Sequence, residues 1–366
     1  MTFQRQVAFW VGALIVLVLL LWLLSGVLLP FVAGMALAYL LDPVADRLER
    51  IGVSRLIATL MILAAFIVIF VIAMMLVVPL LADQLGQLIA RLPDYALRLQ
   101  QLISEPGQEW LREFLGSSLD NVRGSIGQVV GQGASWLTAF LTQVWAGGQA
   151  LMSIVSLLVV TPVVAFYLLV DWDRMVSSVD RAIPRQYLGE VRTIAADIDG
   201  AVSGFIRGQA LVCLFLGVFY AVGLTMVGLN FGLLIGLGAG FLSFIPYVGS
   251  LTGLVMSAGV ALAQFAPDWI SVGLVLGVFF VGQFLEGNIL QPKLVGRSVG
   301  LHPVWLMFAL FAFGSLMGFV GLLLAVPLAA AIGVLARYAL GRYMNSPLYA
   351  GLPGQKKRDR DLPPAA

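Results

Sequence analysis

The chain has 366 residues, of which 60% are hydrophobic and 11% are charged, and its formal net charge is +2. A soluble domain usually carries about 25% charged residues, so this composition excludes an ordinary soluble protein. The single cysteine, Cys213, excludes an intrachain disulfide, and the single histidine, His302, gives no pattern of a metal site or a serine–histidine pair. We therefore expect an all-α polytopic membrane protein that is not an enzyme and holds no cofactor or metal.

Four stretches have the length of one membrane span, which takes at least about 18 apolar residues. In chain order they are 57–82, 149–170, about 205–228 and 269–290. Three other apolar stretches would reach about 50 Å as single helices, well beyond a hydrocarbon core of roughly 30 Å. These long stretches are 7–41, 231–262 and 303–338.

Each long stretch is interrupted near its middle by glycine or proline. Proline removes a backbone donor and clashes with the preceding turn, so an unbroken helix is not expected there. We predict a helical hairpin for each stretch, with breaks at Ser25-Gly26 and Pro30, at Pro246 and Gly249, and at Gly318, Gly321 and Pro327. The fold class is then four full spans and three hairpins, which together correspond to about eight transmembrane segments.

The distribution of basic residues bears on whether the hairpins re-enter or cross the membrane. If all three re-enter and the N-terminus is inside, only Arg91, Arg98, Arg112 and Arg123 of the 21 basic residues lie outside. If the second and third hairpins cross fully, Lys293 and Arg297 also move outside. The positive-inside rule therefore favours re-entry. Both topologies leave both termini in the cytoplasm.

The chain divides into four regions on this interpretation. Residues 1–82 form an N-terminal hairpin and the first span, and residues 83–147 form an extracytoplasmic amphipathic helical region, interrupted at Pro93. Residues 148–342 form a transport core that contains the second and third hairpins. Residues 343–366 form a basic, disordered cytoplasmic tail.

The most informative polar stretch is GQFLEGNILQPKLVG, residues 282–296, at the end of the last single span. On a helix, Gln283 and Glu286 are three residues apart and share a face. Pro292 disfavours the helical state for the residue before it, Gln291, and deprives the Asn288 carbonyl of its usual partner. Free carbonyls beside a carboxylate and amides bind protons, small cations or polar solutes.

Two alternatives stay open for this stretch. Glu286 is an intramembrane carboxylate and hence a functional candidate, but it lies one turn from the end of the span. It therefore either belongs to a transport site or forms a structural ion pair with Lys293 or Arg297. Gln209, at the start of the span 205–228, is a further candidate contact for the solute.

The predicted hairpin breaks also allow two interpretations, a functional one and one in which the break only serves packing. Non-helical backbone at membrane depth persists only where it is buried in protein or lines a wet cavity. The stretch FIPYVGSLTG, residues 244–253, is therefore either a hairpin tip that exposes carbonyls to a solute path or a glycine-rich packing turn. The predicted breaks of the transport core are Pro246, Gly249, Pro292, Gly321 and Pro327. Paired interrupted helices of this kind are typical of secondary transporters.

Five segments resemble the autoinducer-2 exporter family of bacterial inner-membrane transporters. They are LLPFVAGMALAYLLDPVADRLER, TPVVAFYLLVDWDRM, FLSFIPYVGSLTG, FLEGNILQPKLVGRSVGLHPVWLMFAL and GLLLAVPLAA. The resemblance covers most of the chain and is weakest in 83–147 and the tail. It implies export of a small hydroxylated signalling molecule used in quorum sensing, a homo-oligomer and no catalytic chemistry, although members are also associated with sodium–proton antiport. The positions that match the strongest motifs are Glu286, Asn288, Gln291, Pro292, Lys293, Pro246, Gly249 and Pro327.

The sequence thus predicts a secondary transporter of the bacterial inner membrane. It has no GxxxxGK[ST] loop, so ATP is not expected to drive it directly. The expected partners are a small polar solute, a coupling proton or sodium ion, membrane lipid and further copies of the chain, and no nucleic acid. Glu286 is the candidate coupling group, and Gln283, Asn288 and Gln209 are candidate solute contacts. A sodium/proton antiporter and a non-transporting membrane scaffold remain as alternatives.

Overall fold

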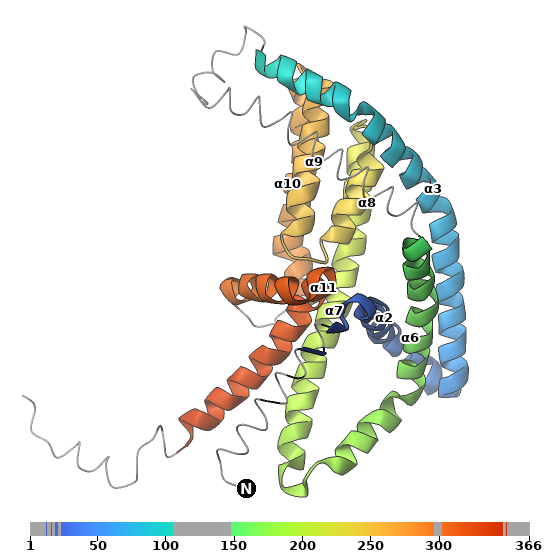
Figure 1. Cartoon of the computed structure of the whole chain (residues 1–366), viewed down its shortest axis with the longest axis vertical. Coiled ribbons are helices and arrows are strands. Elements are labelled where there is room, and N and C mark those ends of the chain that lie inside the picture. Colours follow the sequence, from blue (N-terminus) through green and yellow to red (C-terminus); the bar gives the residue numbers. More distant parts are fainter. Residues whose placement is uncertain are drawn as a thin grey trace, which may run out of the picture. The chain divides into compact units, whose positions relative to one another are not determined.

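In the computed structural model, the described residues are 12, 16, 19–20, 23–104, 148–295, 302–346 and 349, and every regular element among them is a helix (Figure 1). The helices are α2 (Ser25–Arg50), α3 (Arg55–Ser104), α6 (Gly148–Ala182), η1 (Arg185–Tyr187), α7 (Leu188–Met226), α8 (Gly232–Leu242), α9 (Val248–Phe265), α10 (Trp269–Leu285), η2 (Glu286–Val295) and α11 (Pro303–Met344).

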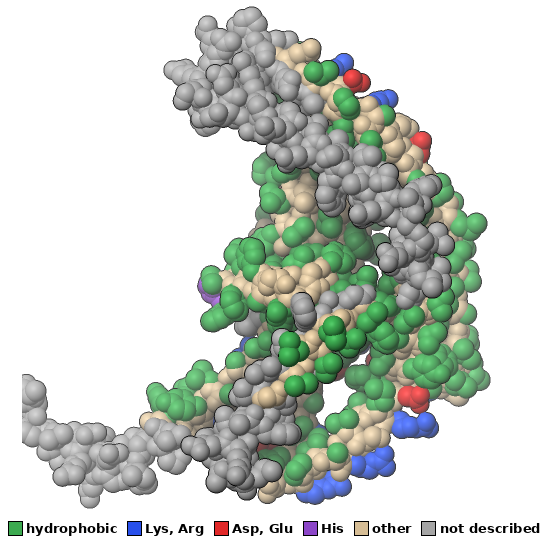
Figure 2. Space-filling view, viewed as in Figure 1, with side chains coloured by type: hydrophobic (Ala, Val, Ile, Leu, Met, Phe, Trp, Pro, Cys, Tyr) green, Lys and Arg blue, Asp and Glu red, His purple; other side chains and the backbone are tan. Residues whose placement is uncertain are grey.

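Six of these segments are long and apolar enough to cross a membrane. They are Val27–Arg50, Arg55–Tyr95, Arg185–Met226, Val248–Phe265, Trp269–Val295 and Pro303–Met344. Figure 2 shows hydrophobic side chains over much of the visible surface, and on α3 the side chains of Met75 and Leu76 are 72% and 70% exposed. Apolar surface of this extent is stable only against lipid or another protein. The protein is therefore an all-α polytopic membrane protein, as the sequence predicts.

The chain forms two compact units. One unit contains Met1–Gly26, Trp172–Ile206 and Gly296–Ala366, and the other contains Val27–Asp171 and Arg207–Val295. We call them the peripheral unit and the hairpin unit, and each is described by itself.

In the hairpin unit, α2, α3 and α6 pack around a small apolar core formed by Leu37, Ala38, Leu63, Ala165 and Leu169. The close approach of α2 to α6 depends on Gly34. A Cβ atom there would lie 2.7 Å from Cβ of Val164 and 2.9 Å from the Thr161 carbonyl oxygen. Small residues of this kind let membrane helices approach at backbone distance.

α8 packs against α7 through three glycines spaced four residues apart. A Cβ atom on Gly232, Gly236 or Gly240 would collide with the α7 backbone at Leu224, Ala221 or Gly217 respectively. These contacts run in opposite directions along the two helices, so α8 is antiparallel to α7. The repeated small residue at every fourth position is the typical membrane packing pattern.

α8 and α9 form the helical hairpin predicted for 231–262. The chain leaves α8 at Leu242 and enters α9 at Val248, with Pro246 in the turn and Tyr247 in the left-handed region at φ 68°. Gly249 is required at this turn because a Cβ atom there would collide with the backbone of Ser243. At the open end, the Asn230 amide donates to Oε1 of Gln264 at 2.7 Å, and Nε2 of Gln264 donates to the Gly228 carbonyl at 2.8 Å.

The predicted breaks in 303–338 require correction. α11 has one non-helical residue, Gly318, with φ 59° and ψ −135°, whereas Gly321 and Pro327 keep helical geometry. The positive φ is available to glycine at little cost, which explains why the break occurs there. Gly321 permits the sharp kink, because a Cβ atom on it would collide with the Phe313 carbonyl. Pro327 is buried inside the second half of α11.

Proline also fails to interrupt two other helices where the sequence indicated a break. α3 runs from Arg55 to Ser104 through Pro79 and Pro93, so residues 83–104 continue the span 57–82 as one curved helix (Figure 1). α2 likewise continues through Pro30, after a turn at Leu24. A proline removes only one helical hydrogen bond, and a long helix absorbs it by bending. Most of the first half of the predicted hairpin 7–41, the residues 105–147 and nearly all of the tail lie outside the described residues.

Candidate functional site

Glu286 stands where α10 gives way to the π-helix η2. Nε2 of Gln283 donates to Oε2 of Glu286 at 2.9 Å, so these two side chains, which the sequence places on one helix face, are in contact. Gln291, one and a half turns further along, is also hydrogen-bonded to the carboxylate. The carboxylate therefore has amide partners from both sides in the chain. A switch from α- to π-helix is frequent at functional sites because it re-aims side chains on one helix.

Tyr220 of α7 anchors this group. Its hydroxyl lies 3.4 Å from Nε2 of Gln283, and its ring stacks on Phe279 with a centroid separation of 4.4 Å. The Tyr220 ring also covers Gly282, where a Cβ atom would collide with it. Tyr220 is fully buried, so the exposed side chain of Gln283 has an ordered partner on α7.

The hairpin tip is held to α7 by Gln209. Its side chain is 2% exposed, and its Nε2 donates a 2.6 Å hydrogen bond to the Ser243 carbonyl at the end of α8. The hydroxyl of Ser243 donates in turn to the Ala239 carbonyl at 2.8 Å. The break after α8 leaves backbone carbonyls without helical partners, and Gln209 satisfies one of them. The buried amide thus positions the tip.

η2 lies directly against α7 beside Gln209. A Cβ atom on Gly208 would collide with the carbonyl of Leu294, so the two backbones touch. The Glu286 carboxylate lies within electrostatic range of Cys213, which is one turn from Gln209 on α7. The structure therefore places the predicted residues Gln209, Gln283, Glu286 and Gln291 around one stretch of α7.

Two predicted site residues lie apart from this group. Nδ2 of Asn288 donates to the Phe284 carbonyl of its own helix at 3.0 Å, and the side chain is exposed. Lys293 is exposed as well, and the ion pairs of the described residues include none between Lys293 and Glu286. Arg297 lies outside the described residues. Among the described residues the partners of Glu286 are therefore amides and not Lys293.

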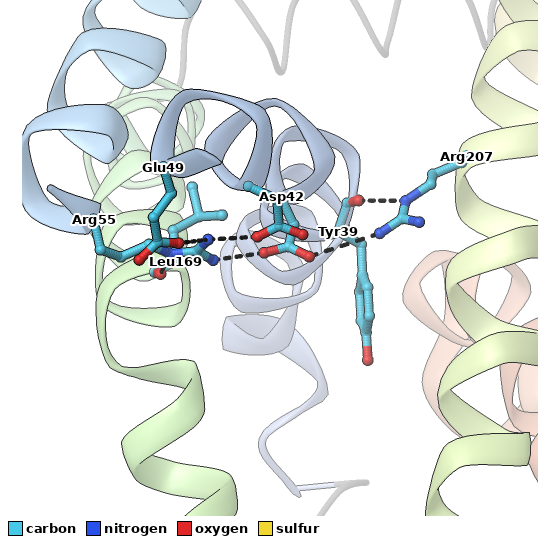
Figure 3. A network of polar contacts seen from close by, with 7 residues as sticks. Tyr39, Asp42, Glu49, Arg55, Leu169 and Arg207 are labelled. Atoms are coloured by element: carbon cyan, nitrogen blue, oxygen red, sulfur yellow. Dashed lines mark hydrogen bonds and ion pairs between the residues drawn. The ribbon is translucent and has the colours of Figure 1, made fainter. Parts of the chain in front are cut away.

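A charge network on the neighbouring helices was not anticipated from the sequence (Figure 3). Arg55 at the start of α3 contacts three carboxylates at the end of α2, at 2.6 Å from Asp42, 2.7 Å from Asp46 and 3.4 Å from Glu49. Its Nε donates to the Leu169 carbonyl of α6 at 2.8 Å. The signal that could have found it is the spacing of the three acidic residues, which places them on one face of α2.

Asp42 connects this network to α7. Nη2 of Arg207 lies 3.9 Å from Oδ2 of Asp42, and Nε of Arg207 donates to the Tyr39 carbonyl at 2.8 Å (Figure 3). Arg207 immediately precedes Gly208 and Gln209, which contact η2 and the hairpin tip. The charge network therefore holds the part of α7 that carries the site.

The described residues contain no group of three or more histidine, cysteine or acidic side chains placed to hold a metal ion. What they do contain is a carboxylate flanked by amides, next to a hairpin tip whose Ser243 carbonyl accepts a hydrogen bond from Gln209. Such a set is suited to a proton, a monovalent cation or a small hydroxylated solute, because each of these is bound by oxygen and amide groups.

Comparisons with known proteins show the family of the chain. The sequence profile described as "AI-2E family transporter" matches residues 11–340. The chain belongs to the AI-2E transporter family. Relatives in this family include "Putative transport protein YrrI" of Bacillus subtilis, 31% identical over 318 residues that cover 86% of this chain and 87% of the relative. "Putative permease PerM" of Escherichia coli is 29% identical over 312 residues, covering 84% of this chain and 86% of the relative. The protein is thus a multi-pass membrane transporter of this family, consistent with a bacterial inner membrane.

Proposed function

We propose that this AI-2E family protein is a secondary transporter that exports a small polar or hydroxylated solute, such as the autoinducer-2 signalling molecule, and that Glu286 couples export to an ion gradient. The observation that carries the proposal is the position of Glu286. It is an intramembrane carboxylate solvated by the amides of Gln283 and Gln291, beside a hairpin tip anchored by Gln209.

The dimensions of α8 support a hairpin that re-enters. Its eleven residues span about 16 Å at the helical rise, roughly half of the hydrocarbon core, whereas the eighteen residues of α9 span about 27 Å. The two ends of the hairpin are joined by the hydrogen bonds of Gln264 to Asn230 and Gly228. A hairpin whose ends meet enters and leaves on the same face of the membrane, and the tip lies at depth. With both termini in the cytoplasm, that face is the extracytoplasmic one.

The partners of Glu286 favour a coupling role over a structural one. A permanently charged carboxylate in a membrane segment is costly unless a positive charge compensates it. Gln283 and Gln291 supply hydrogen bonds without a charge. Uptake of a proton or a sodium ion would neutralise the Glu286 carboxylate. The fraction of carboxylates that hold the ion then follows the ion gradient. Gln283 and Gln291 are then the nearest candidates for contact with the solute.

The transport test uses purified protein in reconstituted vesicles with an imposed proton gradient and a labelled hydroxylated solute. We expect Glu286→Gln to reduce flux by about tenfold or more, or to abolish its pH dependence between about pH 6 and about pH 8, because the variant keeps the hydrogen bonds but cannot gain a proton. Asn288→Ala is the matched control, since its amide bonds only its own helix. Flux and pH dependence equal to the wild type in Glu286→Gln would refute the coupling role.

A sodium/proton antiporter built on the same residues is the second candidate. The carboxylate of Glu286 and the side-chain oxygens around it are hard ligands of the kind that sodium accepts. A sodium jump that moves protons across the vesicle membrane without any organic solute, and fails in Glu286→Gln, would identify this function. If neither solute nor ions cross the membrane of vesicles that contain the protein, the non-transporting scaffold is the remaining alternative. We further propose that the transporter works as a homo-oligomer, which mass measurement of the detergent-solubilised protein tests.

A further inference from the structure

The peripheral unit contains a groove that does not belong to the transport site. It lies between the first half of α7 and the end of α11 and has a volume of about 700 Å³. The α7 side carries Gly189, Thr193, Asp197 and Gly200, which recur every three or four residues and so share one helix face. The α11 side carries Val334, Arg337 and Tyr338.

One end of the groove is lined by a hydrogen-bonded polar cluster. Glu190 pairs with Arg342 at 3.1 Å and is hydrogen-bonded to Tyr338. The hydroxyl of Thr193 donates to the Gly189 carbonyl of its own helix. These groups hold the α7 and α11 walls together. Their polar atoms already have hydrogen-bond partners within the protein, so they do not call for a ligand.

Two exposed charged groups of the lining have no partner among the residues that the structure describes. Asp197 and Arg337 make no ion pair or hydrogen bond through their side chains with any described residue, although both line the same groove. One offers a carboxylate and the other a guanidinium. A ligand that satisfies both must carry a positive hydrogen-bond donor and an anionic group in one molecule.

Two glycines of the lining also indicate a site that is kept open for a ligand. Gly189 and Gly200 both lie in α7 with helical geometry, where glycine is less favourable than alanine. Neither is required for packing, since a Cβ atom on either would meet nothing within 4 Å. Glycine at both positions therefore keeps the groove open.

The other end of the groove is apolar. Ala201 and Val334 are each 7% exposed, and Ile194 lines the wall between them and the polar cluster. The segments Arg185–Met226 and Pro303–Met344, which carry the lining, are both apolar enough to cross a membrane. The groove thus matches an amphiphile with a zwitterionic head, and its volume is within the usual range of small-molecule sites, about 300 to 1,000 Å³.

We propose that this groove binds a phosphoethanolamine group, with the ammonium at Asp197 and the phosphate at Arg337. Arginine presents a planar fork that matches phosphate oxygens, and a primary ammonium donates to a carboxylate. The group comes either from the headgroup of a membrane phospholipid or from a soluble glycerophosphoethanolamine. This site does not depend on the proposed transport function, because it uses none of the residues around Glu286.

The test measures dissociation constants of the full-length protein in detergent. The probes are short-chain phosphatidylethanolamine, short-chain phosphatidylglycerol, which lacks the ammonium, and soluble glycerophosphoethanolamine. We expect phosphatidylethanolamine to bind at least about tenfold more tightly than phosphatidylglycerol, and Asp197→Asn and Arg337→Gln each to weaken it by about tenfold, as the loss of a charge-assisted hydrogen bond predicts. If glycerophosphoethanolamine also binds, and both charge variants weaken its binding, the natural ligand is a soluble molecule. If only the phospholipid binds, the ligand is a membrane lipid.

Two glycine variants distinguish a groove that binds a ligand from one that has only a structural role. Gly200→Ala should weaken phosphatidylethanolamine binding and leave thermal stability unchanged or higher. Gly341→Ala on α11 meets nothing within 4 Å and does not line the groove, so binding should be unchanged. Equal affinity for phosphatidylethanolamine and phosphatidylglycerol, or wild-type affinity in both charge variants, would overturn the proposal.

Discussion

The side-chain amide of Gln209 donates a 2.6 Å hydrogen bond to the carbonyl of Ser243, the C-cap residue of α8. One buried side chain of α7 therefore supports the tip of the α8–α9 hairpin, beside the group that contains Glu286. The function proposed here needs that tip in a fixed position.

Replacing Gln209 by leucine should destabilise the protein. The substitution leaves the buried Ser243 carbonyl without a donor, which costs about 1 to 3 kcal/mol. Thermal unfolding in detergent, with far-ultraviolet circular dichroism, measures the loss. Gln87→Ala is the matched control, because this glutamine bonds Asp83 on the exposed surface of α3 and its loss should change stability little. Equal unfolding temperatures for the wild type and Gln209→Leu would show that the contact does not hold the tip.

Packing between α7 and α8 should tolerate no added carbon at Gly236. A Cβ atom there collides with the backbone of Ala221, so Gly236→Ala forces the helices apart at a cost of about 1 to 3 kcal/mol. Gly238→Ala is a control in the same helix, where a Cβ atom meets nothing within 4 Å. Comparison of the two unfolding temperatures tests the packing. A Gly238→Ala protein as unstable as Gly236→Ala would contradict it.

The charge network should contribute more than a surface pair does. Arg55→Ala leaves three neighbouring carboxylates without their shared partner and should cost about 1 to 3 kcal/mol of unfolding free energy. Arg192→Ala removes only the exposed pair with Asp180 and should have little effect. Denaturant unfolding of both variants measures the difference. If Arg192→Ala proves the more damaging change, the network is not a structural element.

Acid should weaken the N-terminal cap of α10, which is formed by the Asp268 carboxylate. The Ser271 hydroxyl, followed by the backbone amides of Ser271 and Ile270, holds the pKa of Asp268 below its ordinary value of 3.8. A depressed pKa means that the cap stabilises the fold at every pH above that ordinary value and that this contribution is lost as the pH falls through the folded pKa. Asp268→Asn should lack this component of the acid dependence while it keeps an acceptor for the amides. Unfolding temperatures of both proteins between neutral pH and about pH 3 provide the measurement.

Local chemistry made part of this structure predictable. The hairpin at 231–262 follows from Pro246 and Gly249, because a turn depends on the few residues that form it. The pairing of Gln283 with Glu286 follows from their spacing on one helix. The predictions at Pro93 and Pro327 were wrong for the opposite reason, since contacts elsewhere on a long helix outweigh the loss of one hydrogen bond.

Contacts between distant segments were not predictable from the sequence alone. The partners of Arg55 lie on α2 and α6, and the residue on α6, Leu169, is 114 positions away. Gln209 meets Ser243 across 34 positions, and nothing in either segment indicates the partner. The glycines of α8 carry a recognisable spacing, but which helix they face is a property of the folded chain.

The central claim is that the α8–α9 hairpin re-enters the membrane, and labelling of single cysteines tests it most directly. After replacement of Cys213, cysteines at Met226, Asp268 and Lys293 are exposed to a membrane-impermeant thiol reagent from each side; the first two flank the hairpin and all three side chains are exposed. The account predicts that Met226→Cys and Asp268→Cys react from the extracytoplasmic side and Lys293→Cys from the cytoplasmic side. Reaction of Met226→Cys and Asp268→Cys from opposite sides would show that the hairpin crosses the membrane and would contradict the account.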